Sequence, residues 1–495
     1  MTRPRRLADL VGGLPVAGSF SPTFEVSGVA HDSRCVEPGD LFVAWAGKHH
    51  DGRLFAADAV ARGAVAVLAD GPAPSGVLVP WITAQAPRAL LAPIAAELYD
   101  HPDRELVMLG VTGTNGKSTT VVLLQRIWEA AGRPCGVMGT LGYRFREHEF
   151  AGERTTPEAS DFFRTLREMR EAGAQAVAME VSSHALAQGR VAGAQFDLAL
   201  FTNLTRDHFD FHGGFESYFA AKRMLFAALR KNGKAVVNAD DAYGRRLAQE
   251  LPGALTFGEH ARVSFDSVEL DAEGIRGVLR TPRGEFPFAS PLLGRYNLYN
   301  LLAAAAGAEA LSASHEAVAG AFAQQGALPG RMEPVRGGQE FPVAIDYAHT
   351  DAALVAALTS FREFTRRKVV VVFGCGGDRD PGKRPLMGEA AGRLADLPIA
   401  TSDNPRSEDP QVILQAVEAG LKASGNVAYR IVPDRREAIR RAVTIAAGAP
   451  DEWAVLVAGK GHETVQIVGE QRLPFSDREE LTKAVEERRG SAARG

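Results

Sequence analysis

A glycine-rich turn between an apolar run and a helical run constrains this chain more than any other feature. Residues 106–119 read Leu-Val-Met-Leu-Gly-Val-Thr-Gly-Thr-Asn-Gly-Lys-Ser-Thr. Glycines at 110, 113 and 116 let backbone N–H groups converge on phosphate oxygens, which the positive end of the following helix also attracts. Lys117 can reach the terminal phosphates, and the Ser118 hydroxyl can hold a magnesium ion. We therefore expect the chain to bind ATP or GTP.

The residues after this turn support the same interpretation. Val121, Leu124, Trp128 and Ala131 recur at three- and four-residue spacing, which predicts one buried helix face. The loop departs from the general phosphate-loop pattern, because Val111 stands five positions before Gly116, where that pattern has glycine. The loop therefore belongs to a variant of the pattern.

Bulk composition excludes several classes of protein. With 495 residues the chain is too long for a single core, and its 45% apolar and 23% charged residues are ordinary for a globular protein. With a net charge of −4 the chain has no overall excess of basic residues, so we do not expect nucleic acid to be its main partner. No apolar run is long enough for a membrane span or a signal peptide, and three widely separated cysteines favour reduced thiols. We expect a cytoplasmic monomer without membrane insertion.

Strand-like and helix-like runs alternate along most of the chain. From about residue 105 to 333, apolar runs such as 176–181 and 198–202 alternate with helical stretches, and farther on runs such as 369–373 are typical of buried strands that end in polar or glycine-rich turns. This alternation predicts an α/β fold with a largely parallel sheet and helices packed on both faces. Loop-rich breaks near residues 101–103 and 328–333 divide the chain into expected domains at 1–102, 103–333 and 334–495. We expect the tail from residue 486 onward to be frayed.

Polar residues follow two of the expected strands in the middle segment. Glu180 ends one apolar run, and His208 lies just after the next, in Asn-Leu-Thr-Arg-Asp-His. Ligands bind at the carboxyl ends of strands in open α/β sheets, and oxygen or imidazole ligands could complete a magnesium shell begun by Ser118. The alternative is a hydrogen-bonded loop pair without metal. Asp210 and His212 have a weaker claim to this site.

The loop Gly-Thr-Asn-Gly-Lys-Ser-Thr at 113–119 resembles that of the Mur ligase family. The resemblance extends over nearly the whole chain and implies three domains: a small uridine-binding α/β domain, a central phosphate-loop domain and a Rossmann-like C-terminal domain. It also implies ATP and Mg²⁺ as cofactors. The residues that it assigns to ATP are Gly113, Thr114, Asn115, Gly116, Lys117, Ser118, Thr119, Asn297, Arg331 and Asp346.

The same resemblance suggests how the reaction is catalysed. Lys222 matches a lysine that is carbamylated in the family, and a carbamate would supply anionic oxygens to a second magnesium ion. Lys117, Glu180, His208, Lys222 and Arg331 are then the catalytic residues, and Ser118, Glu180, His208 and carbamylated Lys222 the metal ligands. The family usually has proline where this chain has Asp351, after Asp-Tyr-Ala-His-Thr. We expect that change to alter loop stiffness more than chemistry.

Two groups of motifs in the first half of the chain resemble the family's contacts to a UDP-muramoyl dipeptide. Hydroxyl and amide donors suit a sugar and a peptide, and Arg190 suits a carboxylate. The residues concerned are His31, Ser33, Lys48, His49, His50, Thr155, Thr156, Ser182, Gln188 and Arg190. Each piece alone could be an ordinary surface turn.

The C-terminal motifs indicate the incoming amino acid. Asp-Asn-Pro-Arg at 403–406 resembles the motif of family members that add meso-diaminopimelate, whose distal carboxylate Arg406 could grip through paired N–H donors. The residues assigned to this substrate are Arg379, Asp403, Asn404, Pro405, Arg406, Gly459 and Glu463.

The resemblance therefore implies an ATP-dependent ligase of peptidoglycan precursor synthesis. It would add meso-diaminopimelate to the D-glutamyl γ-carboxylate of UDP-N-acetylmuramoyl-L-alanyl-D-glutamate through an acyl phosphate. The alternatives are a lysine-adding member of the family, a folate-polyglutamate or cyanophycin type of ligase, and a nucleotide-dependent switch.

Overall fold

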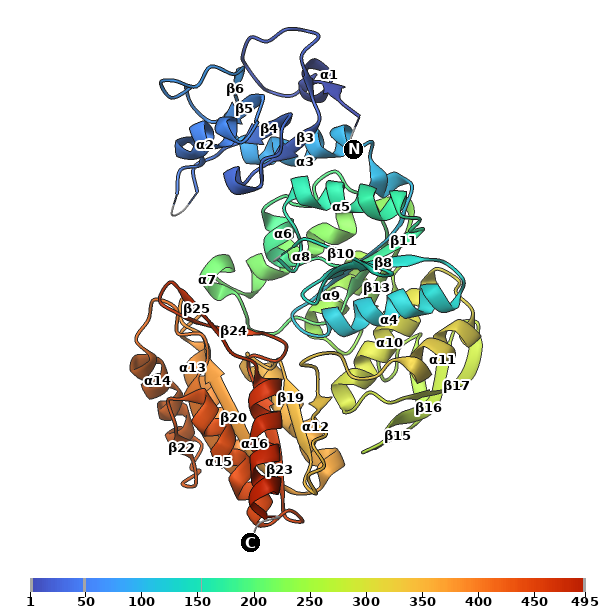
Figure 1. Cartoon of the computed structure of the whole chain (residues 1–495). Helices are drawn as coiled ribbons and strands as arrows, with labels where there is room; N and C mark the ends of the chain where they lie inside the picture. The colour runs from blue at the N-terminus through green and yellow to red at the C-terminus, as the bar shows by residue number, and fades with distance from the viewer. Residues whose placement is uncertain (1–2, 48–49, 153, 493–495) are drawn as a thin grey trace. The chain divides into compact units, whose positions relative to one another are not determined.

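The computed structural model describes residues 3–47, 50–152 and 154–492 (Figure 1). The chain forms two compact units, each assembled from several segments. Unit 1 comprises Met1–Thr112, Gly132–Leu200 and Ala221–Ala235, and unit 2 comprises Gly113–Ala131, Phe201–Ala220 and Val236–Gly495.

A four-stranded parallel sheet forms the N-terminal part of unit 1. Its strands, in spatial order, are β3 (Gly28–Ala30), β4 (Asp40–Val43), β5 (Ala66–Ala69) and β6 (Trp81–Thr83). Every residue of β3, β4 and β5 is buried, which explains why these runs, apart from Asp40 at the start of β4, are apolar rather than alternating. The other elements of this part are β1 (Arg5–Arg6), α1 (Leu7–Val11), β2 (Glu25–Val26), η1 (Ser33–Cys35), η2 (Gly52–Phe55), α2 (Ala56–Ala61), α3 (Pro87–Leu98) and η3 (Pro102–Arg104).

An eight-stranded sheet follows, in the order β10-β9-β8-β11-β7-β12-β13-β14. β11 is parallel to both β7 and β8, and its last residue, Glu180, is in register with Val111 on β7. The strand that ends in Glu180 therefore ends beside the strand that feeds the glycine-rich loop. The strands are β7 (Val107–Thr112), β8 (Cys135–Gly139), β9 (Gly142–Phe145), β10 (His148–Phe150), β11 (Ala176–Glu180), β12 (Phe196–Phe201), β13 (Leu229–Asn238) and β14 (Leu255–Phe257).

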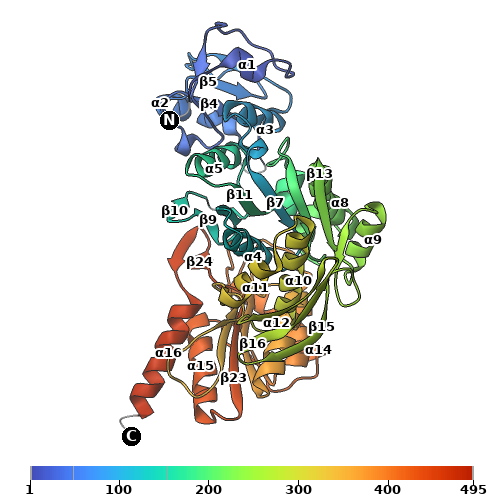
Figure 2. The same ribbon diagram turned by 90° about the vertical axis from the view of Figure 1, so that its right-hand side faces the viewer.

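Helices occupy the segments between these strands. In unit 2, α4 lies beside α10 and α11 (Figure 2). Five alanines of α10, at 303–306 and 308, are buried, and their small side chains allow close helix packing. The helices of this part of the chain are α4 (Lys117–Ala130), α5 (Ala159–Glu171), α6 (Ser183–Ala187), α7 (Phe209–His212), α8 (Phe215–Ala227), α9 (Ala242–Glu250), α10 (Arg295–Ala310) and α11 (His315–Gln324).

A three-stranded antiparallel sheet interrupts the expected alternation. It consists of β15 (Ser264–Asp271), β16 (Gly274–Thr281) and β17 (Gly284–Ser290), which pair in sequence order. β17 alternates buried and exposed residues, as a sheet with one solvated face requires. The expectation of uninterrupted strand–helix alternation over this segment was therefore wrong.

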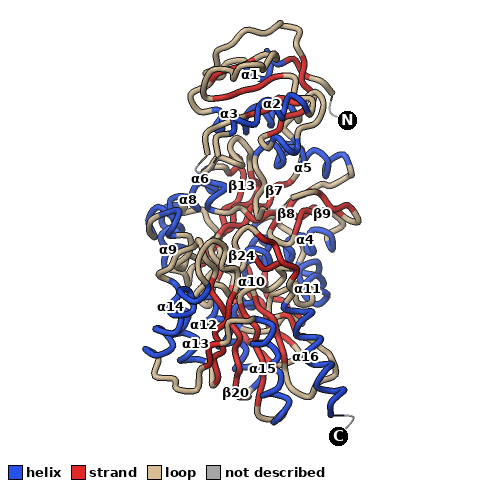
Figure 3. The backbone as a smooth tube through the Cα atoms, turned by 60° about the vertical axis from the view of Figure 1, so that its left-hand side comes forward, coloured by secondary structure: helices blue, strands red, loops and turns tan. Residues whose placement is uncertain are grey.

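The C-terminal part of unit 2 is built on a six-stranded sheet with helices on both faces (Figure 3). Val369, Val371 and Phe373 of β20 join one core with α12, α13 and α14, whereas Val370 and Val372 join the opposite core with α15 and α16. The two-residue period of the strand thus places its side chains in two separate cores.

In spatial order the strands are β18 (Glu333–Pro334), β19 (Val343–Asp346), β23 (Trp453–Ala458), β20 (Lys368–Cys375), β21 (Leu397–Ser402) and β22 (Arg430–Ile431). The remaining elements are α12 (Asp351–Thr365), α13 (Lys383–Leu394), α14 (Pro410–Ala423), α15 (Arg435–Gly448), the hairpin of β24 (Val465–Val468) and β25 (Gln471–Pro474), and α16 (Asp477–Ala492).

The expected α/β class with largely parallel sheets is confirmed. The expected fraying from residue 486 was wrong as far as Ala492, because α16 continues to that residue. Among the described residues, no helix combines the length and apolarity needed to cross a membrane.

Candidate functional site

The glycine-rich loop of unit 2 has no room for side chains at two of its positions. Gly113 and Gly116 have φ angles of 147° and 86°. A Cβ atom on Gly113 would lie 1.9 Å from Thr202 Oγ1, and one on Gly116 would lie 2.3 Å from Asn300 Oδ1. The backbone therefore approaches its surroundings as closely as only glycine allows.

The loop is held from behind by the segment that follows β12. The backbone N–H of Thr114 donates to Asn203 O at 2.8 Å, and that of Asn115 donates to Asn203 Oδ1 at 2.9 Å. Asn203 Nδ2 and Thr202 Oγ1 both donate to Asn115 O. This bonding fixes the loop conformation independently of any ligand.

Lys117 is the first residue of α4, and its ammonium folds back over the loop. Nζ donates to Gly113 O at 3.1 Å and to Thr114 O at 2.9 Å. A positive charge is thus held over the loop backbone at the N-terminal end of a helix, where phosphate groups bind. Ser118 Oγ, one residue on, accepts a hydrogen bond from Arg331 Nη2 at 3.3 Å.

Arg331 lies close both to the loop and to Asp346, a buried carboxylate. Its guanidinium carbon lies 4.5 Å from the centre of the Tyr347 ring. Asp346 Oδ2 accepts hydrogen bonds from Tyr296 Oη at 2.9 Å and from the Met332 backbone at 2.7 Å. Burial raises the pKa of Asp346, and the charge of Arg331 opposes that rise.

Asn297 is the remaining residue assigned to the nucleotide, and its side chain points into the protein. Its Nδ2 donates to Leu293 O, and its Oδ1 accepts from Asn300 Nδ2 at 2.9 Å. Asn300 is the residue that faces Gly116. Unit 2 therefore brings together the loop residues 113–119, Arg331 and Asp346, with Asn297 connected to the loop through Asn300.

In unit 1, Glu180 lies in a network of hydroxyl groups. Its carboxylate accepts from Thr140 N at 2.9 Å and from Thr140 Oγ1 at 3.3 Å, and Thr140 Oγ1 lies 3.0 Å from Thr155 Oγ1. Thr156 Oγ1 donates to Glu180 O at 2.8 Å and accepts from Ser182 N. The threonines and serine assigned to the dipeptide thus lie around Glu180.

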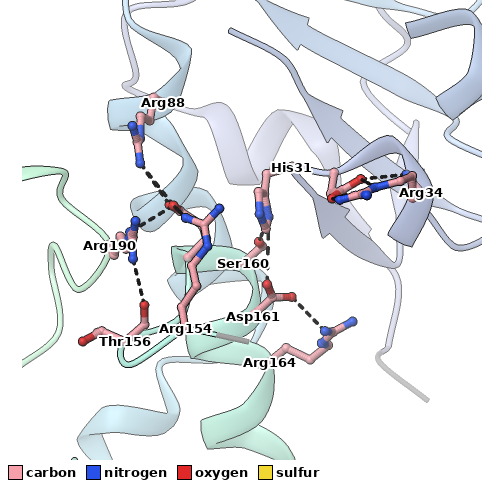
Figure 4. A network of polar contacts seen from close by, with 11 residues as sticks. His31, Arg34, Arg88, Arg154, Thr156, Ser160, Asp161, Arg164 and Arg190 are labelled. Carbon is pink, nitrogen blue, oxygen red and sulfur yellow. Dashed lines mark hydrogen bonds and ion pairs between the residues drawn. The ribbon is translucent and has the colours of Figure 1, made fainter. Parts of the chain in front are cut away.

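Arg190 and His31 lie in a second group of polar contacts in unit 1 (Figure 4). Arg190 donates to Thr156 O at 3.0 Å and to Gln188 Oε1 at 2.7 Å. His31 Nδ1 lies 2.8 Å from Ser160 Oγ, and burial lowers the pKa of His31 although Asp161 raises it. The expected uridine and dipeptide residues therefore meet in one unit.

The other expected residues of the first half of the chain are less connected. Ser33 begins the short helix η1. His50 O accepts from the Gly47 backbone, and the His50 ring lies 6.4 Å from that of Phe55. Lys48 and His49 lie outside the described residues.

The expected metal ligands are divided between the units. Glu180 and Lys222 belong to unit 1, where both side chains are 2% exposed, and Ser118 and His208 belong to unit 2. Among residues placed well enough to describe, no group of three or more His, Cys, Asp and Glu side chains forms a metal site by itself.

Asp207, which was not predicted, anchors His208. His208 Nε2 lies 3.2 Å from Asp207 Oδ2, and His349 Nε2 approaches the same oxygen at 3.9 Å. Burial raises the pKa of Asp207, but the neighbouring charges of His208, His349 and Lys383 outweigh burial and lower it to about 2. The carboxylate is therefore ionised and orients His208.

Three loops at the carboxyl ends of β20, β21 and β23 form the site assigned to the amino acid. Lys460, in the loop after β23, connects that loop to the loop after β21: its fully buried ammonium donates to Asn404 Oδ1 at 3.1 Å, Glu463 Oε2 at 3.0 Å and Val465 O at 2.6 Å. Asn404 Nδ2 donates to the same Glu463 oxygen at 2.8 Å. Glu463 thus has one oxygen committed to the protein, and its other oxygen lies 3.4 Å from Tyr347 Oη.

Two arginines stand beside these acidic and amide groups. Arg406, which has a left-handed φ of 54°, donates through Nη1 to Gly377 O at 2.7 Å. Both Arg406 and Arg379 come within 4 Å of the Cβ position of Gly376. Burial, and then the charge of Arg379, lower the pKa of Arg406. Asp403 lies next to Gly459, where a Cβ atom would be 2.8 Å from Asp403 Oδ2.

Sequence reasoning missed several residues that build these sites. Asn203 lies in the Asn-Leu-Thr-Arg-Asp-His segment, and Asn300 and Lys460 lie close in sequence to the expected residues Asn297 and Gly459, but the roles of all three depend on contacts with distant segments. Polar residues directly after a strand or within a glycine-rich turn were the available signal for Asn203 and Lys460.

Family models match three consecutive parts of the chain. Residues 25–99 match the Mur ligase family, catalytic domain; residues 111–308 match the Mur ligase middle domain; and residues 330–461 match the Mur ligase, glutamate ligase domain.

Full-length relatives match over nearly the whole chain. Proteins of Geobacter metallireducens and Gloeobacter violaceus are 42% and 44% identical, over 97% and 98% of this chain and 98% and 99% of their own length. A protein of Solibacter usitatus is 44% identical over 94% of both chains. All three are named UDP-N-acetylmuramoyl-L-alanyl-D-glutamate–2,6-diaminopimelate ligase.

Solved structures agree with this assignment. A structure of a ligase with that same name is 32% identical, covers 98% of this chain and 100% of its own, and superposes with a TM-score of 0.66. MurF ligase from Thermotoga maritima in complex with ADP shares the fold, with 18% identity, a TM-score of 0.65 and coverage of 94% of this chain and 98% of its own. The chain belongs to the Mur ligase family.

Proposed function

We propose that this protein joins meso-diaminopimelate to the D-glutamyl γ-carboxylate of UDP-N-acetylmuramoyl-L-alanyl-D-glutamate and converts ATP to ADP and phosphate. The names of relatives 42–44% identical over nearly the whole chain support this reaction. The observation that carries the choice of amino acid is the pair of guanidiniums, Arg379 and Arg406, beside the carboxylates of Asp403 and Glu463.

This arrangement matches the charges of meso-diaminopimelate. A distal carboxylate suits Arg406, and a distal ammonium suits the Glu463 oxygen that Lys460 does not occupy. Lysine has no distal carboxylate, so it would leave two neighbouring positive side chains without an anion. We therefore assign Arg379, Asp403, Asn404, Pro405, Arg406, Gly459 and Glu463 to this substrate.

The nucleotide site would activate the carboxylate. Transfer of the γ-phosphoryl group of ATP to a γ-carboxylate oxygen gives an acyl phosphate and ADP. The diaminopimelate amine then attacks the carbonyl carbon, an amide bond forms, the amine loses a proton, and phosphate leaves. Lys117 over the loop and Arg331 beside Ser118 supply positive charge. This charge would stabilise the negative charge that the phosphoryl oxygens gain during transfer.

The UDP-linked substrate is assigned to unit 1. Thr155, Thr156, Ser182 and Gln188 offer hydroxyl and amide groups to the dipeptide, and Arg190 offers a cation to a carboxylate. His31, Ser33, Lys48, His49 and His50 are assigned to the uridine end.

The oxygen donors of Ser118, Glu180 and a carbamate on Lys222 fit magnesium, which prefers hard oxygen ligands, and His208 would add an imidazole nitrogen. Ser118, Glu180, His208 and Lys222, the last as a carbamate, would hold it. When bound, magnesium neutralises charge on phosphate oxygens. Lys222 is 2% exposed, and carbamylation would convert its buried cation into an anionic oxygen donor. Intact mass of the native protein should show an added carbon dioxide, and Lys222→Ala should regain activity with short carboxylates; full activity of that variant without rescue would refute the role.

We also propose functional domains at 1–102, 103–333 and 334–495, in a monomer. Because the substrates are ATP and a UDP-linked precursor, we place the reaction in the cytoplasm. Light scattering should give a mass near 52.8 kDa.

The experiment that tests the function measures phosphate release with ATP, magnesium and the UDP-muramoyl dipeptide, with meso-diaminopimelate or L-lysine added in parallel. We expect release with diaminopimelate and a product heavier by one diaminopimelate less one water. Release with lysine instead would overturn the choice of amino acid, and release with neither would favour a nucleotide-dependent switch.

A further inference from the structure

Three arginines share one buried carboxylate in unit 1. Arg88 Nη2 lies 3.1 Å and Arg190 Nε 2.9 Å from Glu158 Oε1, and Arg154 Nη1 contacts the same oxygen. Figure 4 shows the guanidiniums of Arg88, Arg154 and Arg190 turned toward one another. Glu158 is 3% exposed. Three positive charges thus face one negative charge.

The excess of positive charge affects Arg190 directly. Burial lowers the pKa of Arg190 to about 10, and the charges of Arg154 and Arg88 act in the same direction against the opposing effect of Glu158. One carboxylate therefore does not compensate the cluster. A further anion at this place would gain from all three guanidiniums.

Arg88 connects the two groups of residues assigned to the UDP-linked substrate. Its guanidinium carbon lies 5.3 Å from the centre of the Trp45 ring, which stacks on His31 at 6.2 Å. On its other side, Arg88 Nη2 donates to Gln188 Oε1 at 2.8 Å, the same oxygen that accepts from Arg190. Arg88 Nε is buried and has no hydrogen-bond partner within the described part of the chain.

We propose that Arg88, together with Arg154 and Arg190, binds an oxyanion of the UDP-muramoyl dipeptide, and that Glu158 offsets only part of the charge of the three guanidiniums. The anion is a peptide carboxylate or the diphosphate, which present the same charged oxygens. Arg88 is then a specificity-determining residue in the N-terminal segment that acts on the same substrate as Arg190. This inference rests on the proposed function for the identity of the ligand.

Calorimetry without ATP or amino acid separates this binding from the reaction. The ligands are UDP, UDP-N-acetylmuramoyl-L-alanyl-D-glutamate and its analogue with an amide in place of the D-glutamyl α-carboxylate. For Arg88→Met we expect about tenfold weaker binding of the full substrate, and Arg88→Lys should fall between Met and wild type. Loss restricted to the full substrate identifies the carboxylate, and equal loss for all three ligands identifies the diphosphate. Binding of all three within twofold of wild type would overturn the proposal.

Two further variants separate binding from structure. Arg62→Ala, which removes an exposed arginine of the same segment, should bind like wild type. Glu158→Gln keeps the size and an acceptor oxygen but removes the negative charge, so binding of the full substrate should be as tight or tighter. Weaker binding in this variant would mean that the cluster is only structural and would overturn the proposal, even if Arg88→Met failed to fold.

Failure of this inference can be distinguished from failure of the proposed function. Wild-type protein that binds the UDP-linked substrate but releases no phosphate with either amino acid would contradict the ligase reaction and leave the Arg88 test valid. Wild-type protein that binds neither UDP nor the full substrate would contradict both.

Discussion

The nucleotide loop and the amino-acid site of unit 2 are built in opposite ways. Residues 113–119 hold their shape through backbone groups and through glycines that approach Thr202 and Asn300. The amino-acid site instead depends on side chains from three loops, two of which are joined by the buried ammonium of Lys460. A site made of backbone can be recognised in a short stretch of sequence, whereas a site made of side chains requires the fold.

The largest expected effect is the loss of Lys117, whose ammonium lies over the backbone-built loop. Lys117→Met should lower amino-acid-dependent phosphate release by about a thousandfold or more, because charge on the transferring phosphoryl group loses its partner. Thermal unfolding should change little. Lys368→Met, at an exposed lysine paired with Glu452, is the matched control. Retention of a tenth of the activity would contradict the role of Lys117.

Arg406 tests the side-chain-built site. Arg406→Ala should lower kcat/KM for diaminopimelate by about 100-fold, since a charged bidentate contact is lost, while KM for ATP stays within twofold. Arg406→Lys keeps the charge without the fork and should recover only part of the loss. Steady-state kinetics with each substrate varied in turn measure this split, and equal losses for both substrates would contradict the assignment.

Lys460 tests whether one side chain holds the amino-acid site together. Lys460→Met should raise KM for diaminopimelate by about tenfold and lower the free energy of unfolding by about 1–3 kcal/mol, because Asn404 and Glu463 lose their common partner. Lys422→Met, at an exposed lysine paired with Glu418, should do neither. An unchanged KM for diaminopimelate in Lys460→Met would show that the loops keep their conformation without this side chain.

Gly116 gives the smallest expected effect and tests the backbone-built site. Gly116→Ala should weaken nucleotide binding about fivefold, because Cβ would meet Asn300 Oδ1. Gly132 also has a left-handed φ, of 74°, but no atom lies within 4 Å of the position that a Cβ would take there. Gly132→Ala therefore isolates the cost of the φ angle alone. Asn300→Ala should restore part of the affinity of Gly116→Ala, which a double-mutant cycle with nucleotide titration measures. Independent effects in that cycle would contradict the steric account.

The two kinds of site also differ in how much of them could be predicted from the sequence. The α/β class and the loop at 113–119 could be predicted because periodicity and glycine spacing are local signals. The antiparallel sheet of β15–β17 was missed because one short alternating segment was grouped with its helical surroundings. The roles of Lys460, Asn300 and Arg88 could not be predicted, since each lies against residues that only the fold brings near: Asn404, Gly116 and Gln188.

The central claim is that the backbone-built site phosphorylates the carboxylate to which the side-chain-built site delivers an amine. Labelling both γ-carboxylate oxygens of the UDP-muramoyl dipeptide with oxygen-18 tests this directly, because one labelled oxygen must leave with the phosphate. We expect mass spectrometry of the released phosphate to show one labelled oxygen per molecule when ATP and diaminopimelate are supplied. Unlabelled phosphate formed in step with the amide product would contradict the acyl-phosphate route.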